Sequence, residues 1–197
     1  MSLSLLLAAD DKAPSNRTRD REVDIHHIKI DVTVDLKAES VYGHVVHELS
    51  PLHSSLASFE LDAEDMTIRR VRLNDKDIAF EHNGEKLHVT LDNAIGWQDT
   101  VKIRIDYTSF PLLGTFFIKP DETYQDKPWQ AWTQGEENDN HHWVPIYDYP
   151  NDRSTFEISL TVDDAFKAVS NGELMSVTKN KDGTHTWHWH EHYPMVS

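Results

Sequence analysis

Short runs in which apolar and polar residues alternate recur along most of this chain. Residues 28–36 (Ile-Lys-Ile-Asp-Val-Thr-Val-Asp-Leu) alternate without a break, and residues 101–107 repeat the pattern. A period of two places every second side chain on the same face, as in a strand that is buried on one side only. No long window shows the period of an amphipathic helix. The chain is therefore expected to fold as an all-β protein.

Turn-forming residues separate these strand-like runs. Asn-Asp-Lys-Asp at residues 74–77, Asn-Gly at 83–84 and 171–172, and Asn-Lys-Asp-Gly at 180–183 favour turns. Further strand-like runs lie at residues 41–49, 57–61, 67–73, 86–91, 155–162, 168–170, 174–179 and 184–192. Roughly nine to eleven short strands with turns between them are typical of a β-sandwich or of curved sheets.

Charge and composition exclude several classes of partner. The formal net charge of −15 repels nucleic acid and anionic membrane surfaces, so neither is expected to bind. Cysteine is absent, which rules out disulfides and thiolate chemistry. The apolar run at residues 3–9 is too short to span a membrane. These features predict a soluble acidic protein and fit a cytoplasmic, periplasmic or secreted location equally well.

The two ends of the chain differ in character. Residues 1–21 are expected to be a flexible leader or a segment added for expression, and residues 22–197 to form one β domain. The last residues, 187–197, are extended and aromatic rather than polar. Because native termini are more often polar and frayed, we interpret the chain as a fragment that ends near a domain boundary.

The chain has thirteen histidines, and their spacing bears on metal binding. A zincin helix requires the sequence His-Glu-x-x-His, which does not occur in this chain. His44 and His47 lie in a strand-like run, where a spacing of three points the two side chains to opposite faces. Neither pattern predicts a metal site.

A second histidine group lies near the end of the chain. His188, His190 and His192 share one face of a predicted strand, and Trp187 and Trp189 share the other. Same-face neighbours on a strand are roughly 7 Å apart, which is long for a compact tetrahedral site. We therefore expect a solvated imidazole face opposite an aromatic core face, and the sequence assigns no metal ligand to this chain.

Functional groups are densest in the irregular run at residues 132–152. Gln134 and Glu136 are two residues apart and would project together from an extended segment. An amide beside a carboxylate suits recognition of an ammonium group by charge-assisted hydrogen bonds, and a solvated polar pair is the alternative. His141 and His142, with Asp148 nearby, are expected to form hydrogen bonds within the loop or to contact a substrate or a neighbouring domain.

Six motifs in order resemble a known family. They are Gly-Thr-Phe-Phe-Ile (114–118), Thr-Gln-Gly-Glu (133–136), Val-Pro-Ile-Tyr-Asp-Tyr-Pro (144–150), Thr-Phe-Glu-Ile (155–158), Ala-Val-Ser-Asn-Gly-Glu-Leu (168–174) and Trp-His-Trp-His-Glu-His-Tyr-Pro-Met (187–195). Together they resemble the N-terminal domain of zinc-dependent aminopeptidases of the aminopeptidase N and leukotriene hydrolase type.

The resemblance implies a saddle-like, curved β-sandwich that lacks the catalytic machinery. In that family the zinc ligands, the general-base glutamate and the Gly-x-Met-Glu-Asn segment belong to the next domain. No catalytic residue and no cofactor are therefore expected in this chain, which would be inactive alone. Zinc would lie in the missing catalytic domain of the same polypeptide, and that domain and a peptide substrate would be its partners.

The resemblance also implies roles for two loop residues. Gln134 would line the pocket for the first side chain of the substrate, and Glu136 would help bind its α-ammonium group. His141 and His142 replace a common arginine pair, and Ile146 and Tyr149 replace a frequent cysteine and glutamate, which leaves the residue preference open. The competing interpretation is a stand-alone β-sandwich binding or interaction module without peptidase activity.

Overall fold

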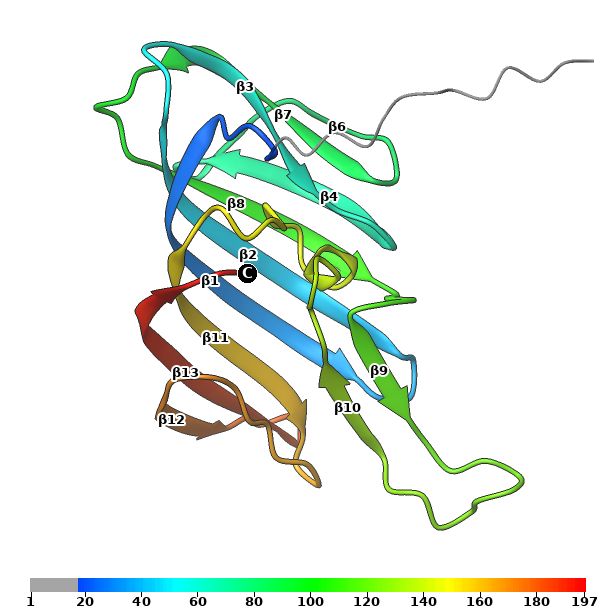
Figure 1. Ribbon diagram of the computed structural model, residues 1–197. Coiled ribbons are helices and arrows are strands. Elements are labelled where there is room, and N and C mark those ends of the chain that lie inside the picture. The colour runs from blue at the N-terminus through cyan, green and yellow to red at the C-terminus, as the bar shows by residue number, and fades with distance from the viewer. Residues whose placement is uncertain (1–17) are drawn as a thin grey trace, which may run out of the picture.

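The computed structural model describes residues 18–197, and residues 1–17, most of the expected leader, lie outside the described part (Figure 1). Almost all regular structure is strand. The strands are β1 Val23–Asp35, β2 Ser40–Pro51, β3 Leu56–Asp62, β4 Met66–Leu73, β5 Lys76–Asp77, β6 Phe80–His82, β7 Lys86–Ile95, β8 Val101–Ser109, β9 Thr115–Ile118, β10 Gln130–Thr133, β11 Ser154–Asp163, β12 Glu173–Lys179 and β13 Thr184–Met195.

Three open sheets make up the fold. The largest has eight strands in the order β12-β13-β11-β1-β2-β8-β4-β5, and the others are β3-β7-β6 and the hairpin β9-β10. Within the large sheet β1 and β11 pair in parallel, while the remaining neighbours are antiparallel. The one helical element in residues 18–197 is the 3₁₀ turn η1, Asn140–His142. The all-β prediction is confirmed.

The alternation of β1 changes phase in the middle of the strand. Val23 and Ile25 are buried, and then Ile28, Ile30 and Val32 are buried, so the inward-facing positions change from odd to even numbers. A bulge between Ile25 and His27 causes the change, because it inserts an extra residue against β2. The alternation predicted a strand only from residue 28, since the bulge hides the earlier part of the pattern.

Turn-forming residues correctly predict some strand boundaries but not others. Asn74 and Asp75 both have positive φ, 46° and 71°, as the predicted turn between β4 and β5 requires. Lys76 and Asp77, expected in that turn, form β5. The strand expected at residues 168–170 is wrong, because this segment lies between β11 and β12 without ladder pairing.

The start of the described chain is held by ion pairs. Arg19 pairs with the buried carboxylate of Asp62, and its guanidinium lies 4.4 Å from the centre of the Tyr147 ring. Arg21 pairs with Asp152. Residues 18–21, which the sequence placed in the leader, therefore contribute contacts to the domain.

The large sheet separates the histidines as the strand period requires. His47 is fully buried on the core face, and His44 lies on the opposite face. On β13 the ring centres of His190 and His192 are 3.9 Å apart, so these two share a face. His188 Nε2 lies 3.2 Å from Glu157 on the neighbouring strand β11. The Trp187 and Trp189 indole nitrogens are buried.

Candidate functional site

The loop between β10 and β11 is anchored to the end of β3 by backbone contacts. Ile146 and Asp62 exchange two backbone hydrogen bonds, 2.8 and 3.0 Å long, which form an isolated antiparallel bridge. The Glu64 amide donates to the His141 carbonyl at 3.0 Å. These bonds place the loop beside the connection between β3 and β4, although the two segments are far apart in sequence.

Asp62 forms a buried charge centre beneath this loop. Its carboxylate is paired with Arg19 and Lys86, and it accepts a hydrogen bond from the Asp148 amide at 2.9 Å. Burial would raise the pKa of Asp62, but the hydrogen bonds from Arg19, Lys86 and the Asp148 amide hold that pKa below its ordinary value. The carboxylate therefore stays ionised and orients the loop backbone.

Gly114 supports the loop from the start of the β9–β10 hairpin. It has a φ of +70°, and a Cβ built on it would lie 1.9 Å from the Asp139 carbonyl oxygen. Only glycine allows this approach between the two backbones without strain.

A change of Gly114 to alanine is expected to destabilise the chain by about 2 kcal/mol, since it combines unfavourable φ with a backbone clash. Chemical denaturation of the parent and of Gly114→Ala measures the difference. The matched control is Gly84→Ala, because Gly84 also has positive φ but no atom lies within 4 Å of its Cβ position. Equal losses in both variants would show that the loop contact contributes nothing.

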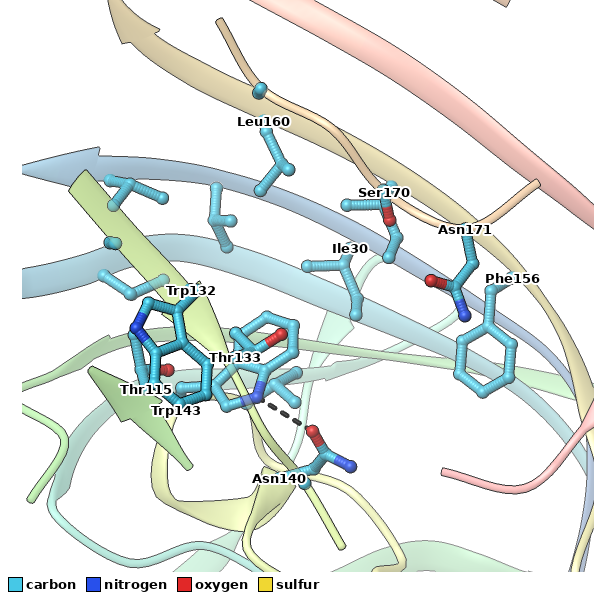
Figure 2. Close-up of a pocket in the computed structure, with 18 of the residues that line it drawn as sticks. Ile30, Thr115, Trp132, Thr133, Asn140, Trp143, Phe156, Leu160, Ser170 and Asn171 are labelled. Carbon is cyan, nitrogen blue, oxygen red and sulfur yellow. Dashed lines mark hydrogen bonds between the residues drawn. The ribbon is translucent and has the colours of Figure 1, made fainter. Parts of the chain in front are cut away.

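A groove of about 1390 Å³ lies between the large sheet, the hairpin strand β10 and the loop. Its floor is apolar, and Figure 2 shows Ile30, Phe156 and Leu160 of the sheet on one side and Trp132 of the hairpin on another. The Trp143 indole nitrogen donates to the Asn140 side-chain oxygen at 3.0 Å at the loop side of the groove. Trp132 is 46% exposed, so the groove presents a large aromatic surface to solvent.

The two predicted recognition residues take different positions at this groove. Strand β10 ends at Thr133, so the extended geometry assumed for Gln134 and Glu136 does not continue through both residues. Both side chains are exposed. Glu136 lines the groove, whereas Gln134 is not among its lining residues and is held by its amide, which donates to the Gly114 carbonyl at 2.9 Å.

Within the loop, His141 and His142 each form a hydrogen bond to a carboxylate. Asp148 is buried and accepts from both the backbone amide and Nδ1 of His141, at 3.0 and 2.9 Å. His142 Nδ1 lies 2.8 Å from Asp65, and the two imidazole ring centres are 4.4 Å apart. The hydrogen bond to Asp148 raises the pKa of His141, which outweighs the opposite effect of burial. His141 thus has its partner inside the loop, whereas His142 has its partner in the β3–β4 connection.

Sequence reasoning missed the acidic partners of these histidines. Asp62 is the last residue of strand β3, Glu64 and Asp65 follow the strand, and all three reach the loop only through the fold. The available signal was a group of carboxylates placed between two strand-like runs. Nothing in the local sequence indicated that this group meets residues 141–148.

Comparisons with known proteins agree with the fold. The description "Peptidase M1 N-terminal domain" matches residues 24–197, and the chain therefore belongs to this family. In crystal structures the fold is shared with the M1 zinc metallopeptidase of Deinococcus radiodurans, at a TM-score of 0.76 and 22% identity over 88% of this chain and 40% of that one. It is also shared with yeast LTA4 hydrolase, at a TM-score of 0.73 and 15% identity over 89% of this chain and 27% of that one.

Curated relatives include proteins of two kinds. Probable aminopeptidase 1 of Saccharolobus solfataricus is 27% identical over 132 residues, covering 67% of this chain and 16% of that protein. Transcription initiation factor TFIID subunit 2 of Gallus gallus is 23% identical over 199 residues, covering 80% of this chain and 17% of that protein. The chain thus spans under a fifth of the length of these two relatives. Among residues 18–197, no helix has the length and apolar character needed to cross a membrane.

Proposed function

We propose that this chain is the N-terminal domain of a zinc aminopeptidase and that its 134–136 loop helps recognise the amino terminus of a peptide. The observation that supports this most directly is the position of Glu136, an exposed carboxylate at a large groove. Neither Glu136 nor its neighbour Glu137 forms an ion pair within residues 18–197. An ammonium group that enters the groove would find a carboxylate available to accept charge-assisted hydrogen bonds.

The groove itself is proposed to receive the catalytic domain of the same polypeptide. Apolar side chains of two neighbouring strands line it: Ile30, Val32 and Val34 of β1 and Ile158, Leu160 and Val162 of β11. Trp129, Trp132 and Val169 add apolar side chains that are exposed to solvent, and exposed apolar areas mark interaction surfaces. The similarity covers only 40% of the M1 metallopeptidase of Deinococcus radiodurans. The remainder of such a polypeptide is therefore the partner that we propose for the groove.

The residues present do not fit the family's catalytic zinc. The sequence has no His-Glu-x-x-His segment, so no general base stands beside a pair of helical histidines. The zinc that activates water in such enzymes would be held by the catalytic domain, and this chain contributes binding and orientation of the substrate.

Residues 1–197 alone are expected to hydrolyse no aminoacyl chromogenic substrate, because the group that activates water is absent. The measurement compares this chain with the complete polypeptide expressed from the same gene, over a range of substrate and metal concentrations. Turnover by residues 1–197 at a rate near that of the complete polypeptide would contradict the proposal. Absence of turnover in both would favour a role without peptidase activity.

A non-catalytic interaction module is the second candidate function. The similarity to a subunit of a transcription initiation factor favours it, since that protein is named for a role in transcription. The coding sequence downstream of Ser197 separates the two candidates. A His-Glu-x-x-His segment there supports the peptidase, and its absence supports the interaction module.

A further inference from the structure

Three side chains near the base of the loop offer a set of metal ligands. One ring nitrogen each of His141 and His142 and a carboxylate oxygen of Glu64 all lie within 4.8 Å of one another. We propose that these three residues bind a divalent transition-metal ion, with Zn²⁺ as the best fit. The site includes neither Gln134 nor Glu136, so it stands independently of the proposed substrate recognition.

Both imidazoles are oriented by carboxylates in the way that metal-binding histidines are. Asp148, with 2% of its side chain exposed, lies 2.9 Å from Nδ1 of His141, and Asp65 lies 2.8 Å from Nδ1 of His142. A carboxylate that accepts the proton of one ring nitrogen fixes the tautomer and leaves the other nitrogen with a free lone pair. Two adjacent histidines that each have such a carboxylate partner indicate a metal site more strongly than a histidine pair alone.

The spacing of the ligand atoms suits a small ion after a minor adjustment. His141 Nε2 and Glu64 Oε2 are 3.5 Å apart. Tetrahedral ligands about 2.0–2.1 Å from zinc stand roughly 3.4 Å from each other, so this pair already has the required separation. Glu64 is the ligand that can adjust, because 42% of its side chain is exposed, while the hydrogen bond that its backbone amide donates to the His141 carbonyl keeps the residue nearby.

A polar cavity of about 290 Å³ opens beside the ligands and provides both an entry path and room for water. Glu64 and His141 line it, and the ring centre of His142 lies 4.4 Å from that of His141. The charge around the cavity favours a cation, because four carboxylates face two cationic side chains: Asp62, Glu64, Glu85 and Asp148 against Arg19 and Lys86. Three protein ligands and a water molecule would complete a four-coordinate site.

The donor set identifies the class of ion. Imidazole nitrogens suit Zn²⁺ and its neighbours in the first transition series, whereas Ca²⁺ and Mg²⁺ prefer sites built from oxygen atoms alone. Bound metal would add a further link between the β3–β4 connection and the loop, besides the Asp62 bridge and the hydrogen bonds of Glu64 and Asp65. The sequence had assigned His141 and His142 to loop hydrogen bonds and outside contacts, because Glu64 is remote in sequence.

The test measures binding of Co²⁺ and Zn²⁺ to the 197-residue chain, freed of metal by chelation, by calorimetry and by the ligand-field absorption of Co²⁺ at mildly alkaline pH. One ion per chain with the intense bands of four-coordinate Co²⁺ is expected. His141→Ala and Glu64→Gln should each weaken binding by at least about ten-fold, and Asp148→Asn by about ten- to a hundred-fold through the orientation of His141. Circular dichroism confirms that each variant is folded, and Glu64→Gln, at a partly exposed position, serves if a histidine variant does not fold.

The histidines of β13 supply the matched control. His188→Ala and His190→Ala lie in the other histidine group, where Glu157 already pairs with Lys29, and should leave the Co²⁺ spectrum and the affinity unchanged. Saturating Zn²⁺ should raise the melting temperature of the parent but not that of Glu64→Gln. The proposal is overturned if no ion binds, or if binding survives Glu64→Gln and His141→Ala but is lost with the β13 variants.

Discussion

In the complete polypeptide, Glu136→Gln is expected to lower kcat/KM for free-amine substrates by tens- to thousands-fold. A carboxylate that faces an ammonium group in a partly desolvated groove is worth about 2–5 kcal/mol when one partner loses its charge. Glutamine keeps the shape of the side chain and removes only the charge, so the ratio of kcat/KM values isolates the electrostatic contribution. Zinc content should not change, because Glu136 is not proposed as a ligand.

The neighbouring carboxylate offers a matched control for this experiment. Glu137 also lines the groove, and Glu137→Gln removes the same charge one residue away. We expect this variant to retain most of the activity, while Gln134→Ala changes the preference among first side chains more than the overall rate. Equal activity of Glu136→Gln and the parent, or equal losses at positions 136 and 137, would contradict the specific role of Glu136.

The second large effect is a loss of stability in acid that comes from His47. Burial lowers the pKa of this imidazole to about 4, although its hydrogen bond to the Pro145 carbonyl, 2.9 Å long, acts in the opposite direction. The folded chain keeps His47 neutral at pH values where the unfolded chain, with a pKa near 6.5, already takes up a proton. This group therefore lowers the free energy of unfolding progressively as the pH falls from about 6.5 to about 4, by about 3 kcal/mol in total.

Urea unfolding of the parent and of His47→Gln across this pH range measures the effect. Glutamine can still donate to the Pro145 carbonyl but does not titrate, so the difference between the two curves isolates His47. The difference should narrow as the pH falls, because only the parent loses stability through this residue. Parallel curves would mean that the folded state admits the proton and that the imidazole is not desolvated.

The alternation of side chains was enough to predict the all-β class and most of the long strands. The runs at residues 41–49 and 101–107 form the antiparallel neighbours β2 and β8, in which the inward-facing residues of one strand lie opposite those of the other. Local sequence failed where pairing with a partner decides the structure. Three features depend on whether a neighbouring strand of the same chain pairs with the segment. They are the bulge after Ile25, the short strand β10 and the unpaired segment at residues 168–170.

The loop residues of the candidate site could be predicted from the sequence, but the residues outside the loop that contact them could not. Glu136 and His141 were found because the loop concentrates polar groups in one run. Asp62 and Glu64 could not be linked to that loop, since β3 and residues 141–148 meet only through tertiary contacts. The burial of His47 was likewise not predictable, because the sequence around a histidine on a strand does not show which face of that strand the core covers.

A structure of the complete polypeptide with a peptide bound is the decisive test of whether Glu136 recognises the amino terminus of the substrate. The measured quantity is the distance between the Glu136 carboxylate and the α-ammonium nitrogen of the peptide. We expect about 2.7–2.9 Å, the length of a charge-assisted hydrogen bond, with the catalytic domain seated against the groove. A peptide whose amino terminus lies away from Glu136, or a groove open to solvent in the complete protein, would contradict it.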